Sequence, residues 1–111
     1  MSGEYGVRVT DQAREQLRVI VRYIAQTLQE PAAARRLLDT LENAIASLSR
    51  MPCRIALTEE EPWHGYGVRR MPVKGYLVYF LVDEIDTCVQ IIAVVYGKRD
   101  QTLQLPQMDI E

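Results

Sequence analysis

The sequence has little of the chemistry on which many enzymes depend. Its 111 residues include one histidine, His64, and two cysteines, Cys53 and Cys88, that do not form a Cys-x-x-Cys pair. A single histidine excludes a metal site built from several histidines and leaves a Ser/His/Asp or Cys/His triad only one candidate base. Cysteines this far apart are typical of reduced thiols in a cytoplasmic protein. We therefore expect no metal and no cofactor.

Long hydrophobic runs and an excess of positive charge are absent as well. The longest apolar stretches, 77–82 and 89–96, are far shorter than the ~20 residues that span a bilayer. The N-terminus carries no basic and apolar stretch of the kind found in signal peptides. Thirteen Lys and Arg against fifteen Asp and Glu give a formal charge of −2, which argues against a strongly basic nucleic-acid binder. The expectation is one cytoplasmic domain, residues 1–111, without a membrane segment.

The first half of the chain has the hydrophobic pattern of a strand followed by two helices. Apolar and polar residues alternate over 4–10, as in a short half-buried strand. Apolar residues three and four positions apart predict a helix over 11–29, capped by Thr10 or Asp11, and a second helix from Pro31 to about residue 50. The apolar stripe of the first helix consists of Ala13, Leu17, Ile20, Val21, Ile24 and Leu28. The short connection makes the two helices antiparallel neighbours.

The second half of the chain has the pattern of three strands, 68–73, 76–82 and 88–96. The pair Lys74-Gly75 and the acidic segment 83–87 supply the turns, so an antiparallel meander is the simplest topology. The order β-α-α-β-β-β predicts an α+β fold with an antiparallel helical hairpin on an antiparallel sheet, which the first strand joins by a non-local pairing. We expect the folded core to cover about residues 4–100, with a polar tail over 101–111.

In this order and spacing, several short motifs resemble the RelE/ParE superfamily, the toxins of bacterial type II toxin–antitoxin modules. The resemblance covers about residues 4–105. The motifs that carry it are Tyr23-Ile24-Ala25, Pro31-Ala32-Ala33, Gly67-Val68-Arg69-Arg70-Met71-Pro72-Val73, Gly75-Tyr76-Leu77-Val78-Tyr79 and Val94-Val95-Tyr96-Gly97-Lys98-Arg99-Asp100.

The resemblance implies a small intracellular poison of a plasmid-stabilisation or addiction module, neutralised by a cognate antitoxin. It also implies a toxin dimer or a heterotetramer with the antitoxin as the assembled form. Two branches of the superfamily act differently. The RelE-like branch cleaves mRNA in the ribosomal A site, whereas the ParE-like branch lacks nuclease activity and poisons DNA gyrase.

The residues that the RelE-like branch uses are incomplete in this sequence. RNA cleavage through the 2′-hydroxyl needs a base, cations beside the phosphate and an acid for the leaving oxygen. Of the superfamily's two strand lysines, one position holds Val68 and the other Arg70, and arginine is a poor base because it stays protonated. Where the superfamily has an arginine after the Gly-Tyr pair, this sequence has Leu77. Where the superfamily has a tyrosine near the end of the chain, this sequence has Leu105.

These departures favour a ParE-like toxin that binds a protein target, with DNA gyrase expected. The alternative is a metal-independent mRNA endoribonuclease with a degenerate catalytic set, consisting of Arg70, Lys98, Arg99 and His64. A further alternative is a non-toxic relic that still binds an antitoxin.

Local charge identifies a candidate binding surface on this slightly acidic chain. Residues 62–82 contain three basic side chains and no acidic one, whereas 81–111 contain two basic and six acidic residues. A local basic patch can bind an acidic partner or phosphates even where the net charge is negative. The candidate target- or anion-binding residues are Arg69, Arg70, Lys74, Lys98 and Arg99. In a strand, Arg69 and Arg70 point to opposite faces, so at most one of them contacts a ligand on the sheet surface.

Two aromatic residues, Trp63 and Tyr96, are candidates for partner binding. An indole in a polar loop such as 59–67 often anchors a partner or covers the edge of a core. We expect an apolar antitoxin segment to bind either as a helix in a groove or as an added strand.

Overall fold

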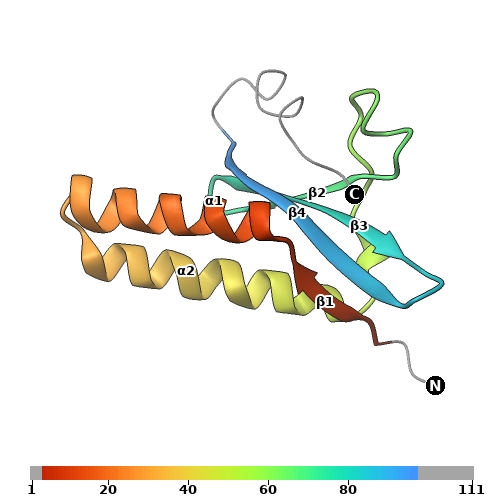
Figure 1. Cartoon of the computed structure of the whole chain (residues 1–111), viewed down its shortest axis with the longest axis horizontal. Helices are drawn as coiled ribbons and strands as arrows, with labels where there is room; N and C mark the ends of the chain where they lie inside the picture. The colour runs from red at the N-terminus through yellow and green to blue at the C-terminus, as the bar shows by residue number, and fades with distance from the viewer. Residues whose placement is uncertain (1–3, 98–111) are drawn as a thin grey trace.

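Two helices lie side by side on one face of a twisted sheet (Figure 1). The computed structural model describes residues 4–97. In chain order the elements are β1 (Gly6–Val9), α1 (Asp11–Arg22), a π-helical turn (Tyr23–Thr27), α2 (Pro31–Ala46), two 3-10 turns (Ser47–Ser49 and Pro52–Arg54), β2 (Arg69–Val73), β3 (Tyr76–Asp83) and β4 (Cys88–Tyr96). The predicted α+β class and element order are confirmed. Among the described residues, neither helix has the length and apolar content needed to cross a membrane.

The sheet has the order β1-β4-β3-β2. Strands β2, β3 and β4 form the predicted antiparallel meander, and β1 joins β4 across the chain. That last pair runs parallel, with Gly6 opposite Cys88 and Val9 opposite Ile91, so the sheet is mixed rather than wholly antiparallel. The residues of β1 alternate between inward and outward side chains, and this alternation does not indicate whether the strand pairs in the parallel or antiparallel direction. The position of α1 sets the direction. At the junction of β1 and α1, Thr10 N donates to Ile91 O at 3.0 Å.

A bulge in β4 explains why this strand is apolar in both phases. Tyr79 pairs with Ala93 and Phe80 pairs with Ile91, so Ile92 is an extra residue in the ladder. As a result, Ile91 packs on the helix side while Ile92 and Ala93 both pack on the opposite side.

The sheet separates two hydrophobic clusters. The helix-side cluster consists of Ala13, Leu41, Ile45, Leu48, Met71, Val78, Phe80, Val89, Ile91 and Val94. The cluster on the opposite face consists of Val68, Leu77, Tyr79, Ile92, Ala93 and Val95, with Trp63 and Leu81 packed against it. The helical hairpin therefore covers one face only, and the loop that contains Trp63 contributes to the other.

The start of α1 agrees with the sequence, and its end does not. Thr10 Oγ1 accepts a hydrogen bond from Ala13 N at 3.2 Å, so of the two predicted N-caps, Thr10 and Asp11, the cap is Thr10. The regular helix stops at Arg22 and continues as a π-helical turn in which Leu28 N donates to Tyr23 O. A π turn takes about one more residue than an α turn, so it rotates the residues after it around the helix axis. Leu28, expected in the core stripe, is consequently 51% exposed.

Candidate functional site

Arg70 and Tyr79 face each other on the side of the sheet away from the helices. They are cross-strand partners of β2 and β3, and Tyr79 is fully buried. Burial raises the pKa of the Tyr79 phenol, the hydrogen bond and positive charge of Arg70 lower it, and Glu60 raises it again, with a net upward shift. The phenol therefore stays neutral and accepts from Arg70. This candidate residue is held within the fold by its strand partner.

Arg69 lies on the other side of β2, as the strand alternation predicted. Its Nη1 donates to Ile55 O at 2.6 Å and ties the strand to the preceding segment. Nearby, Cys53 Sγ lies 3.4 Å from Glu84 Oε2. Burial and this hydrogen bond raise the pKa of the Cys53 thiol, and the Arg69 charge offsets them only in part. A thiol with a raised pKa is mostly protonated at neutral pH, so Cys53 is not an activated nucleophile.

His64 makes a hydrogen bond within the acidic loop, to the residue with which the loop begins. Its Nδ1 lies 2.8 Å from Thr58 O, and because a carbonyl only accepts, Nδ1 carries the proton. The same loop is closed by Thr58 N donating to Val68 O at 2.8 Å and Val68 N donating to Trp63 O at 3.0 Å. The Nδ1 bond gives His64 a structural role, and it leaves only Nε2 for proton transfer.

Among the described candidate cations, Lys74 does not lie beside Arg70. Lys74 is exposed at the tip of the β2–β3 hairpin, in a turn where Lys74 and Gly75 have φ of 51° and 84°. The last residue of β2, Val73, is three strand steps or about 10 Å from Arg70, and Lys74 follows it in the turn. Lys98 and Arg99 lie outside the described residues. Within residues 4–97, no three His, Cys, Asp or Glu side chains cluster closely enough to hold a metal ion.

A second surface runs along α1 on the helix side of the molecule. It is an open groove of about 880 Å³ between α1, the start of α2 and the ends of β3 and β4. The residues that line it are Glu15, Gln16, Val19, Ile20, Tyr23, Ile24, Leu28, Glu30, Ala33, Tyr76, Val94, Val95 and Tyr96. We call this surface the α1 groove.

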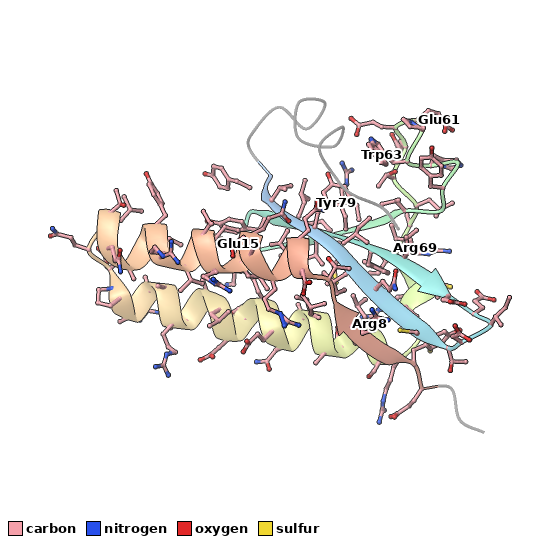
Figure 2. The ribbon with its side chains drawn as sticks, in the orientation of Figure 1. Arg8, Glu15, Glu61, Trp63, Arg69 and Tyr79 are labelled. Atoms are coloured by element: carbon pink, nitrogen blue, oxygen red, sulfur yellow. The ribbon has the colours of Figure 1, made fainter. Side chains whose placement is uncertain are left out.

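The two aromatic candidates lie on different surfaces. Tyr96 lies in the α1 groove, 41% exposed, with its ring centroid 5.3 Å from that of Tyr76. Burial, and to a lesser degree Tyr96, raise the pKa of Tyr76. Trp63 is in the loop that stands away from the helices, half-buried and 6.1 Å from Tyr66 (Figure 2).

Two glutamines of α1 make hydrogen bonds to the edge of β4. Because β1 is short, it pairs with β4 only as far as Ile91. Beyond that point, Gln12 Nε2 donates to Ile92 O at 2.6 Å and Gln16 Oε1 accepts from Val94 N at 2.8 Å. These side chains thus form the hydrogen bonds to the β4 backbone that an added strand would otherwise make.

Sequence reasoning missed the apolar wall of this groove. Val19 and Tyr23 are 51% and 54% exposed and lie four residues apart on α1. That spacing is a second apolar row beside the predicted core stripe, and it is the signal that identifies the groove.

The helical hairpin on one face of a four-stranded mixed sheet gives the chain a fold that can be compared with those of known proteins. The sequence matches the family described as ParE toxin of type II toxin–antitoxin system, parDE, over residues 7–101. The chain therefore belongs to the ParE toxin family. A search of curated proteins finds no match.

Two solved structures share the fold. The chromosomal ParDE toxin–antitoxin system of P. aeruginosa is 19% identical with a TM-score of 0.71, and the match covers 87% of this chain and 100% of that one. The RelBE2 toxin–antitoxin complex of Mycobacterium tuberculosis is 23% identical with a TM-score of 0.61, and the match covers 86% of this chain and 94% of that one.

Proposed function

We propose that this toxin arrests cells by binding and poisoning a protein target, with DNA gyrase the expected one, and that a cognate antitoxin neutralises it. Membership of the ParE toxin family supports the proposal. Both similar structures come from toxin–antitoxin systems, which supports an antitoxin as partner.

The observation that carries this proposal concerns the described residues: within 4–97, the groups that RNA cleavage would use are engaged at separate places. A cleavage site needs a base, a cation and an acid that converge on one phosphate within hydrogen-bond reach. Here His64 fastens its own loop, Arg70 hydrogen-bonds Tyr79, and Lys74 is at the far end of β2. This arrangement supports binding over catalysis.

As the surface that binds the target we propose the basic residues of the edge strand β2 and its turn. The outermost strand of the sheet contains Arg69 and Arg70, and the turn after it contains Lys74. Lys98 and Arg99 complete the proposed set in the sequence. Lys74 is exposed, whereas Arg69 and Arg70 are half-buried. A local group of cations favours an acidic protein surface, and it raises the rate of encounter at low ionic strength.

An induction experiment tests the proposal. The gene is expressed from a tight promoter, and mRNA integrity is followed by primer extension while DNA breaks are followed with a damage reporter. We expect growth arrest with DNA damage and intact mRNA. Rapid ribosome-dependent cuts in mRNA would overturn the proposal in favour of a RelE-like nuclease. Unimpaired growth with abundant folded protein would show a non-toxic relic.

A charge-reversed variant sharpens the same experiment. Lys74→Glu changes an exposed turn residue of the proposed target surface, and Glu59→Lys changes an exposed loop residue outside it. We expect Lys74→Glu to weaken growth arrest and Glu59→Lys to leave it unchanged. Equal toxicity of the two variants would remove Lys74 from the target surface.

A further inference from the structure

The acidic loop, residues 58–67, presents a pair of aromatic rings. Trp63 is half-buried and packs against the cluster on the face opposite the helices, whereas Tyr66 is 61% exposed. The ring centroids are 6.1 Å apart and the ring planes are tilted by 54°, so the two rings do not stack face to face. The faces of aromatic rings attract cations, and tryptophan does so most strongly. The pair is therefore a candidate surface for a positively charged group.

The charged side chains of this loop are all acidic. Residues 58–67 contain Glu59, Glu60 and Glu61 and no lysine or arginine. Glu61 Oε1 accepts a hydrogen bond from Gly65 N at 3.1 Å, and Gly65 lies between the two aromatic residues in the chain. Figure 2 shows Glu61 on the same loop as Trp63, away from the helices. The bond to Gly65 occupies one oxygen of the exposed Glu61 carboxylate and leaves Oε2 for another donor.

Two buried oxygen atoms of the loop lack a hydrogen-bond donor. Within the described part of the chain, Glu60 Oε1 and Thr58 Oγ1 have no hydrogen-bond partner, and Thr58 is only 2% exposed. A buried polar atom without a partner costs free energy, so native proteins usually supply one. A ligand that brings N–H donors to this loop would offset that cost, directly or through a bridging water. These atoms are a second indication of a ligand, independent of the aromatic pair.

Backbone hydrogen bonds hold the loop in shape. His64 N donates to Glu60 O at 2.8 Å, and Tyr66 N donates to Pro62 O at 3.1 Å. A loop that is already ordered loses little conformational freedom when a partner binds. The aromatic rings and the Glu61 carboxylate are thus placed before a ligand arrives.

The combination of aromatic faces and a carboxylate fits the side chain of arginine. A guanidinium is planar, so it can stack on a ring while its N–H groups donate to a carboxylate. The ammonium of lysine is a compact charge without such a face. The exposure of Tyr66 makes the site open rather than enclosed. An open site suits a side chain carried by another protein, because small molecules are usually bound in hollows that bury most of their surface.

We propose that the acidic loop binds an arginine side chain of a partner protein. The guanidinium stacks on the aromatic pair of Trp63 and Tyr66 and donates to Glu61 Oε2. The site lies outside the basic surface proposed for the target, so the inference goes beyond the proposed function.

The fluorescence of the loop itself tests the inference. Trp63 is the only tryptophan of the chain, so the tryptophan emission of the purified full-length protein comes from this loop. The probe is a short, end-blocked alanine peptide with one central arginine. The matched peptide carries citrulline, the neutral isostere of arginine, at the same place. We expect a saturable change in emission with the arginine peptide, and binding of the citrulline peptide that is at least about tenfold weaker.

Two variants test the groups that make the site. Glu61→Gln removes the charge and keeps an oxygen that accepts from Gly65 N, and Tyr66→Leu removes the exposed ring. Each should weaken binding of the arginine peptide by about two- to fivefold. The matched controls are Glu42→Gln on α2 and Tyr23→Leu on α1, which alter exposed side chains of the helices and should leave binding unchanged. Thermal unfolding of each variant verifies that it is folded.

Several outcomes would overturn the inference. These are equal binding of the arginine and citrulline peptides, the absence of any saturable change in emission, and full affinity in both Glu61→Gln and Tyr66→Leu. A lysine peptide that binds as tightly as the arginine peptide would overturn the assignment to a guanidinium. None of these results depends on toxicity, so the inference and the proposed function fail separately.

Discussion

The α1 groove and the opposite face of the sheet differ in which side chains they expose. In the groove, Val19 and Tyr23 are more than half exposed. On the opposite face, Tyr79 is buried against Arg70 and His64 is bonded to Thr58. The contrast teaches that the two described candidates for catalysis, Arg70 and His64, make hydrogen bonds within the fold, while the α1 groove leaves apolar side chains open.

The largest effect is expected from the helix-side core. Phe80 is fully buried in the helix-side cluster, on which the hairpin rests. Phe80→Ala should lower the free energy of unfolding by about 3–5 kcal/mol in urea titrations, because it leaves a cavity. Ile85→Ala, at a side chain that is 94% exposed, is the control, and surface changes of this kind stay within about 0.5 kcal/mol. Similar stability of the two variants would contradict the assignment of this core.

The next effect concerns the opposite face. Tyr79→Phe removes the hydroxyl that accepts from Arg70, and hydrogen bonds to charged groups contribute about 1.5–3 kcal/mol. We expect the midpoint of urea unfolding to fall and growth arrest to persist in a folded sample. If stability is unchanged and toxicity is lost, Tyr79 acts in chemistry and the contrast between the two surfaces is wrong.

A smaller effect is expected from the loop. His64→Ala removes one partly exposed hydrogen bond to Thr58 O, which corresponds to about 0.5–1.5 kcal/mol. Hydrogen exchange of the amide of Val68, which belongs to the same loop closure, should become faster. Growth arrest should be unchanged. Toxicity that disappears with the imidazole would restore His64 as a proton-transfer group.

The smallest effect is a dependence on alkaline pH. Burial raises the pKa of Tyr79 above its ordinary value of 10.0, so the unfolded chain loses this proton at lower pH than the folded one. The associated stability is complete below pH 10 and is lost as pH rises through the folded pKa. Urea midpoints between pH 9 and 12 should fall less for Tyr79→Phe than for the wild type. Identical slopes would show that Tyr79 titrates normally.

Local signals predicted most of the fold. Thr10 is the N-cap of α1, Pro31 opens α2, and the turn at Lys74-Gly75 joins β2 to β3. Each of these depends on interactions within a few residues, so the sequence encodes them directly. The direction of β1 depends on where two helices carry the chain, and a four-residue strand does not encode that path.

The candidate site was less predictable because it depends on phase and packing. The π-helical turn rotates Leu28 out of the core stripe, and nothing in an ordinary 3.6-residue period anticipates it. Likewise, sequence spacing does not predict the hydrogen-bond partners of these side chains. Arg70 bonds to Tyr79, and His64 bonds to Thr58. Opposite faces for Arg69 and Arg70 followed from strand alternation alone.

The most direct test of the central claim compares the two targets in vitro. The purified toxin is titrated into a gyrase supercoiling assay and, in parallel, into ribosomes paused on a defined mRNA. The account predicts inhibited supercoiling with accumulation of cleaved DNA, while the mRNA stays intact. Cleavage of the mRNA in the ribosomal A site with unaffected gyrase would contradict it.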